Sequence, residues 1–180
     1  MLKVSILMPT YNDDYYIREA IESLLSQSLR TFELLIMDDG STDTTEKTIN
    51  SYNDTRIRYF KQKNLGQLNA LFHLVPHISG DFVTILHSDD RLSRHNVVED
   101  ILHLIDEEKR PCLYCELKKI DENGNNTGRL RIKDNLDPAD LIKYAIRKGS
   151  NIIPDIFFVR VLFLWSMCSR IISFGIFPTG

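Results

Sequence analysis

Near its start the chain reads VSILMPTYN over residues 4–12, a short apolar run that Pro9 brings to an end. Apolar residues then recur at helical spacing, at Ile17, Ala20, Ile21, Leu24 and Leu25. The run indicates a buried strand, and the spacing after it indicates an amphipathic helix. The first 25 residues therefore predict a strand followed by a helix.

The same order of strand and helix recurs along the chain. We predict further strands at 32–37, 56–60, 82–86 and 112–120, and a helix at 42–52. A further helix would carry apolar residues between 68 and 75, and another, capped by Ser93, would carry them between 97 and 105. Residues 127–132 would close a hairpin over a turn at 121–125, and Asp137-Pro138 would start a short helix. This alternation predicts a doubly wound α/β fold, a mostly parallel sheet with helices on both faces.

The length and charge of the chain limit the number of domains and the kinds of partner that we expect. The chain has 180 residues and a formal charge of −3, from 22 Lys and Arg against 25 Asp and Glu. No basic block is present, so we expect no nucleic-acid partner. The length allows one globular domain, which we place over residues 1–160, followed by an unassigned apolar tail over 161–180.

Three cysteines and the absence of a signal-peptide pattern lead us to expect a cytoplasmic protein. Cys112 and Cys115 form a C-x-x-C pair, but no second pair stands at zinc-site spacing, so we interpret them as structural. Arg160 and Arg170 interrupt the apolar tail below the length of about 18–20 residues that a membrane span needs. The tail could instead pack on the sheet, at a membrane surface or against another subunit.

Polar segments follow four of the predicted strands, at residues 9–12, 38–41, 64–67 and 87–90. Parallel sheets bind ligands beyond the carboxyl ends of their strands, so these segments are the candidate site. Asp89 and Asp90 would suit Mg²⁺ or Mn²⁺ together with substrate phosphates, or form only an acidic loop. Asp39 would bond a base or ribose, or only its own turn. Tyr11 offers a base an aromatic face, or packs within its loop.

In combination these segments resemble glycosyltransferase family 2. The resemblance covers about residues 3–160 and rests on 3–12, 32–43, Asn64-x-Gly66, Gly80-Asp81-Phe82 and Ser88-Asp89-Asp90. It implies the GT-A fold, a nucleotide-diphosphate sugar donor, and a divalent cation, Mn²⁺ or Mg²⁺. It also implies an inverting transfer to a hydroxyl of a glycan or glycolipid acceptor, as in polysaccharide biosynthesis.

The resemblance also implies roles for residues of the nucleotide pocket. Pro9, Thr10 and Tyr11 would line it, with Tyr11 stacking near the base. Asp39 would hydrogen-bond the base, and this match favours uridine.

Two further segments match the part of the family site that holds the rest of the donor. Asn64, Gly66 and Gln67 match the loop that closes over the nucleotide. Asp89 and Asp90 match the acidic motif for ribose, metal and diphosphate, with Asp90 the first choice as metal ligand. The cation would neutralise charge that develops on the departing diphosphate.

The sequence departs from the family pattern at three places. His87 stands where the family often has an Asp, and we interpret it as a supporting or structural residue because a neutral ring adds no negative charge. Ala70-Leu71-Phe72 replaces a frequent Ala-Arg-Asn. The family places its general base beyond a segment matched by residues 149–154, but the last acid here is Asp155, which lies too early in the alignment. The catalytic base is therefore unknown.

Three functions stay open at this point. The chain is the donor half of a glycosyltransferase, or a nucleotide-sugar-binding or interaction protein without catalysis, or a sugar nucleotidyltransferase. The absence of a glycine-rich phosphate loop near the first strand argues against the third.

Overall fold

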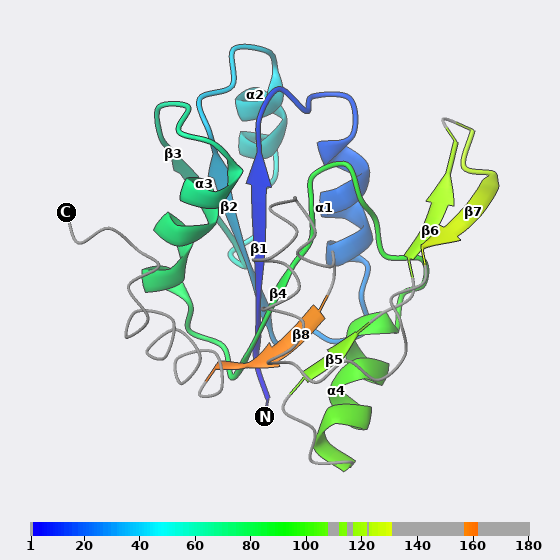
Figure 1. Cartoon of the computed structure of the whole chain (residues 1–180). Coiled ribbons are helices and arrows are strands. Elements are labelled where there is room, and N and C mark those ends of the chain that lie inside the picture. Colours follow the sequence, from blue (N-terminus) through cyan, green and yellow to red (C-terminus); the bar gives the residue numbers. More distant parts are fainter. Residues whose placement is uncertain (1, 108–111, 115–116, 122, 131–156, 162–180) are drawn as a thin grey trace, which may run out of the picture.

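The computed structural model describes residues 2–107, 112–114, 117–121, 123–130 and 157–161. Its strands are β1 (Val4–Thr10), β2 (Phe32–Asp38), β3 (Ile57–Lys61), β4 (Phe82–Ile85), β5 (Cys112–Tyr114), β6 (Leu117–Ile120), β7 (Asn126–Leu130) and β8 (Phe157–Arg160). Its helices are α1 (Ile17–Leu25), α2 (Thr45–Asn50), α3 (Gln67–Leu74), the short 3₁₀ helix η1 (Val75–His77) and α4 (Val97–Glu107). Figure 1 shows their arrangement around the central strand β1.

The main sheet has six strands in the order β3-β2-β1-β4-β8-β5. β1 runs parallel to β2 on one side and to β4 on the other, and β3 runs parallel to β2. β8 lies antiparallel between β4 and β5. The mostly parallel sheet is therefore confirmed, and the carboxyl ends of β1 to β4 meet at one edge.

Helices cover both faces of this sheet, which confirms the doubly wound arrangement. Along the buried strands β1 and β2, alternate residues point to opposite faces, as strand geometry requires. Ile6, Met8, Leu34 and Ile36 join a cluster with α1 and α4, whereas Leu7, Leu35 and Met37 pack with α3. Both faces are apolar, so these strands read as continuous apolar runs in the sequence.

Two sequence predictions about elements need correction, and one strand was not predicted. The predicted strand at 112–120 is two strands, since β5 joins the main sheet and β6 pairs with β7 in a separate hairpin. β8 was not predicted, because its four residues carry too short a pattern. Ser93 does not cap the helix, which begins four residues later at Val97. The chain first makes a turn over residues 93–96.

Several predictions lie outside the described residues. They are the helix starting at Asp137-Pro138, the position of Cys115, and the tail beyond residue 161. No helix in the described part of the chain has the length and apolar character that crossing a bilayer requires.

At the amino-terminal edge of the sheet, Gly80 approaches the backbone of β1. Its amide donates a 2.9 Å hydrogen bond to Ser5 Oγ, which itself donates to buried Glu33. A methyl group on Gly80 would lie 2.7 Å from the Ser5 amide nitrogen and 2.9 Å from the Lys3 carbonyl oxygen.

We predict that Gly80→Ala lowers the free energy of unfolding by about 1–3 kcal/mol, because backbone must move to make room for the methyl group. Gly128→Ala in β7 is the matched control, since nothing lies within 4 Å of a methyl group there. Urea titration of both variants measures the difference. Equal stability of the two variants would show that the close approach at Gly80 is absent.

Candidate functional site

A cleft of about 400 Å³ opens at the carboxyl ends of β1, β2 and β4. It is lined by Pro9, Thr10, Tyr11, Asp13, Asp39, Gln67, His87, Ser88, Asp89 and Asp90. The structure thus brings together all the predicted nucleotide and metal residues except Asn64 and Gly66, which do not line the cleft. Asp13, His87 and Ser88 line it in addition.

The loop after β1 is fixed by the loop after β2. The Asn12 amide donates to Ser41 Oγ at 2.9 Å, and the Thr42 amide donates to Asn12 Oδ1 at 2.8 Å. Asn12 adopts a positive φ of 54°, which Asn tolerates better than most residues. These contacts hold the neighbouring Tyr11 at the cleft, where its side chain stays 47% exposed.

Thr10 contributes an unpaired hydroxyl to the cleft. The residue is only 4% exposed, and its Oγ1 has no hydrogen-bond partner among the described residues. Buried polar groups are normally satisfied, so such a group in a cleft wall is suited to bond a ligand or water.

Asp13 and Ser88 connect the loop after β1 to the acidic segment after β4. Ser88 is buried, and its hydroxyl donates to the Asp13 carboxylate. The Asp13 amide in turn donates to Thr45 Oγ1 at 2.9 Å. Sequence reasoning placed Ser88 in the acidic motif but missed Asp13 and the contact between the two side chains, because the partners are 75 positions apart.

Asp38 and Asp39 are adjacent in sequence, but their carboxylates make different contacts. Asp38 is fully buried and accepts hydrogen bonds from the Ser41 amide at 2.7 Å and the Tyr59 hydroxyl at 2.8 Å. Burial, together with the Asp38 carboxylate, raises the pKa of Tyr59, so the phenol remains a donor. Asp38 therefore holds the turn after β2, and only Asp39 reaches the cleft.

The Asp39 carboxylate organises the loop that precedes α3. Oδ1 accepts from Gln62 Nε2 at 2.6 Å and from the Leu65 amide at 2.9 Å, and Oδ2 accepts from the Gly66 amide at 2.8 Å. A carboxylate offers about four lone-pair sites, so about one acceptor position remains on Oδ2. Sequence analysis predicted contact with a base but did not find this anchoring of the loop.

Two glycines make that anchoring sterically feasible. Gly40 has a φ of +85°, and a methyl group there would lie 2.9 Å from the Asn64 amide nitrogen. Gly66 has a φ of +89° and lies directly before α3. Both backbone conformations favour glycine. Asn64 and Gly66 thus belong to a loop held beside the cleft, although neither lines it.

The acidic segment after β4 has a compact turn geometry. The Asp90 amide donates to the His87 carbonyl oxygen at 3.1 Å, which places the two acidic side chains beside the cleft. Gln67 Nε2 lies 2.7 Å from His87 Nδ1, so this ring nitrogen is engaged by the start of α3.

The acidic side chains at the cleft suit a cation that keeps most of its coordination positions for ligands other than the protein. Among the described residues no group of three or more His, Cys, Asp or Glu side chains is placed to hold a metal ion. Asp89 and Asp90 alone fit Mg²⁺ or Mn²⁺, which take one or two carboxylates plus phosphate oxygens and water. Asp155, the last acidic residue of the chain, lies outside the described residues.

We predict that Asp39→Ala speeds amide hydrogen exchange at Leu65 and Gly66 roughly tenfold or more, because hydrogen bonds to a charged acceptor contribute about 1.5–3 kcal/mol. Asp121→Ala is the control, since that carboxylate holds a different turn through the Asn123 and Asn125 amides. Unchanged protection of residues 65 and 66 in the Asp39 variant would contradict the role of this carboxylate in the loop.

Comparison with known proteins identifies the fold. The model of the family described as glycosyl transferase family 2 matches residues 5–167. An uncharacterised glycosyltransferase of Rickettsia typhi is 31% identical over 167 residues, which are 88% of this chain and 52% of that protein. The chain therefore spans about half the length of this relative.

Two solved structures resemble the chain. S. aureus TarS in complex with UDP-GlcNAc has a TM-score of 0.63 at 28% identity, over 70% of this chain and 37% of that one. The mannosyltransferase PcManGT of Pyrobaculum calidifontis, in complex with GDP-Man and Mn²⁺, has a TM-score of 0.60 at 20% identity, over 66% and 36%. The second likeness bears on the fold alone. Since the family model covers most of its length and the sheet is that of the GT-A neighbours, the chain belongs to glycosyltransferase family 2.

Proposed function

We propose that this chain binds a UDP-sugar as the donor part of an inverting glycosyltransferase whose acceptor is a hydroxyl of a glycan or glycolipid. One observation carries the proposal. Tyr11, Asp39 and the Asp89-Asp90 pair converge on one cleft from the ends of three parallel strands. The 28% identity to TarS, a protein solved with UDP-GlcNAc, supports the choice of donor class.

The base would lie at the end of the cleft formed by Tyr11 and Asp39. Uracil carries one ring N–H between two carbonyl groups, and the remaining acceptor position on Asp39 Oδ2 can receive that N–H. The exposed face of Tyr11 would support the ring from beside it. Cytosine has an acceptor nitrogen at the corresponding ring position, so the same carboxylate would reject it.

The diphosphate would lie at the other end, next to the acidic segment. Asp90 and Asp89 would hold Mn²⁺ or Mg²⁺, and this cation would neutralise charge on the departing diphosphate. Gln67 reaches His87 from the start of α3 and so connects the loop anchored by Asp39 with the acidic segment. The two ends of the donor would therefore contact parts of the site that are already linked.

We predict that UDP binds about tenfold more tightly with Mn²⁺ than without it, a difference of about 1.4 kcal/mol. Asp90→Asn should abolish this enhancement, because it removes the charge from the proposed metal ligand. Asp106→Asn on α4 is the matched control, since it removes the same charge outside the cleft. Calorimetric titration of the three proteins, with CDP and ADP as comparison nucleotides, makes the measurement.

Two results would contradict the proposal. Equal affinity for UDP, CDP and ADP would exclude recognition of the base by Asp39. Full Mn²⁺ enhancement in Asp90→Asn would exclude Asp90 as the metal ligand. Metal-dependent UDP binding without turnover of UDP-GlcNAc or another UDP-sugar would instead favour a nucleotide-sugar-binding protein without catalysis.

A further inference from the structure

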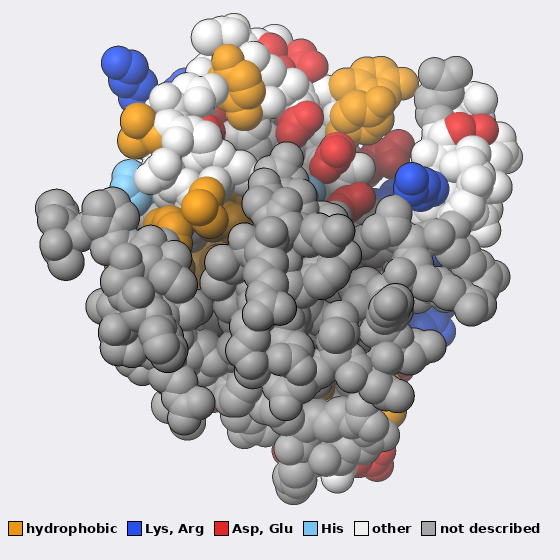
Figure 2. Space-filling view, in the orientation of Figure 1, with side chains coloured by type: hydrophobic (Ala, Val, Ile, Leu, Met, Phe, Trp, Pro, Cys, Tyr) orange, Lys and Arg blue, Asp and Glu red, His pale blue; other side chains and the backbone are white. Residues whose placement is uncertain are grey.

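A second cleft, of about 450 Å³, adjoins the cleft of about 400 Å³ proposed to bind the UDP-sugar donor, here called the donor cleft. The two clefts share Asp89 and Asp90. Its other walls come from the start of α1, from Arg91 and from the turn of the β6-β7 hairpin. Figure 2 shows acidic side chains, a group of hydrophobic ones and a basic one gathered around the upper right of this face. The function described above does not use this cleft.

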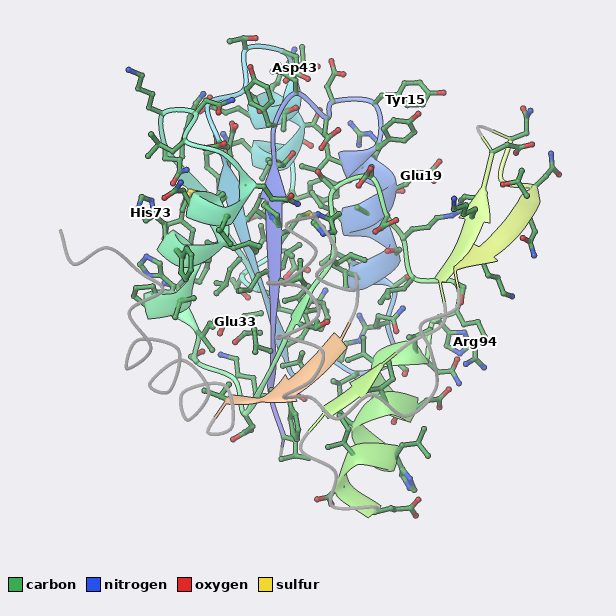
Figure 3. All side chains as sticks on the ribbon, in the orientation of Figure 1. Tyr15, Glu19, Glu33, Asp43, His73 and Arg94 are labelled. Atoms are coloured by element: carbon green, nitrogen blue, oxygen red, sulfur yellow. The ribbon has the colours of Figure 1, made fainter. Side chains whose placement is uncertain are left out.

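Two tyrosines form the aromatic wall of the second cleft. Tyr15 is 74% exposed and Tyr16 is 46% exposed, and their rings meet edge to face with centroids 4.7 Å apart. Exposed aromatic rings beside a polar cleft can stack on the C–H face of a sugar ring, while their hydroxyls bond its hydroxyl groups. Figure 3 shows Tyr15 ahead of α1 and Glu19 in the first turn of the helix, both on the side of the hairpin.

The polar wall of the second cleft is acidic overall, because Arg91 stands against the carboxylates of Glu19, Asp89, Asp90 and Asp121. Arg91 Nη1 lies 3.3 Å from Glu19 Oε2, with both side chains substantially exposed. The pair offers N–H donors and carboxylate acceptors without a net charge of its own. Such a mixture suits a ligand with many hydroxyl groups better than a polyanion.

The hairpin side of the cleft is preformed. The Asp121 carboxylate accepts from the amides of Asn123 and Asn125 at 2.9 and 2.8 Å, and these bonds with Asn125 lower the pKa of Asp121. Gly124 brings the turn against Arg91, because a methyl group there would lie 3.2 Å from Arg91 Nη2. Ligand binding would therefore not have to order this turn first.

We propose that the second cleft binds the acceptor as a neutral oligosaccharide, with Tyr15 as the stacking residue and the Arg91-Glu19 pair as its hydroxyl-binding group. This proposal rests on the proposed function. The shared wall at Asp89 and Asp90 is where the donor's diphosphate would lie, so a saccharide in the second cleft would be held next to the sugar to be transferred.

The test measures the binding of neutral chito-, cello-, manno- and galacto-oligosaccharides to the full chain, by microarray and then by titration of the best ligand. We expect at least one series to bind, and we expect Tyr15→Ala and Arg91→Gln each to weaken it about tenfold or more while UDP affinity stays unchanged. Phe72→Ala on α3 is the matched control, because it truncates an exposed aromatic residue that lines neither cleft.

The same protein samples separate the two proposals. A wild-type chain that fails to bind UDP with Mn²⁺ would overturn the proposed function. A chain that binds UDP but none of the oligosaccharides, or that binds one equally well in both cleft variants, would overturn the acceptor site alone. Tighter oligosaccharide binding in the presence of UDP and Mn²⁺ would support the contact between the two clefts.

Discussion

The parallel pairing of β1 with β2 and β4 is the constraint on which the site depends. Thr10 lies opposite Asp38, and Leu7 lies opposite Ile85. The residues that follow the three strands therefore lie at the same edge of the sheet. An antiparallel β2 would send Asp39 to the far edge and leave Tyr11 and Asp89 without a partner. The apolar contacts of both sheet faces with α1, α3 and α4 hold this register, since a one-residue slip would turn each core side chain to the wrong face.

Hydrogen bonds between polar side chains also connect the loops that follow the strands. These bonds join otherwise separate loops into one site. Asp38 ties the turn after β2 to β3, Asp39 holds the loop before α3, and Asp13 joins the loop after β1 to Ser88. Buried carboxylates are costly unless their oxygens are hydrogen-bonded, and Asp38 and Asp39 each have more than one donor. These donors stabilise the Asp38 and Asp39 carboxylates without a cation, and the remaining acceptor position of Asp39 lies at the cleft.

Local sequence patterns predicted β1 to β4 and the residues that follow them, because an apolar run and its next polar residue are neighbours in the chain. They could not reveal the break between β5 and β6, since that break reflects a change of pairing partner. Nor could they show that Asp39 anchors residues 62–66, or that Tyr15 shares a cleft with Gly124. Those facts depend on contacts between distant residues. The roles of Asp39 and Asp90 toward a nucleotide and a cation remain predictions.

Amide NMR mapping of the ¹⁵N-labelled chain with UDP and Mg²⁺ tests the central claim most directly, namely that one sheet edge forms one nucleotide site. The account predicts shifts that converge on residues 10–13, 39–41, 62–67 and 87–90, with little change at Lys3, Glu33 and Gly80 on the opposite edge. Shifts confined to that opposite edge, or a spectrum in which residues 39 and 89–90 do not respond, would contradict it.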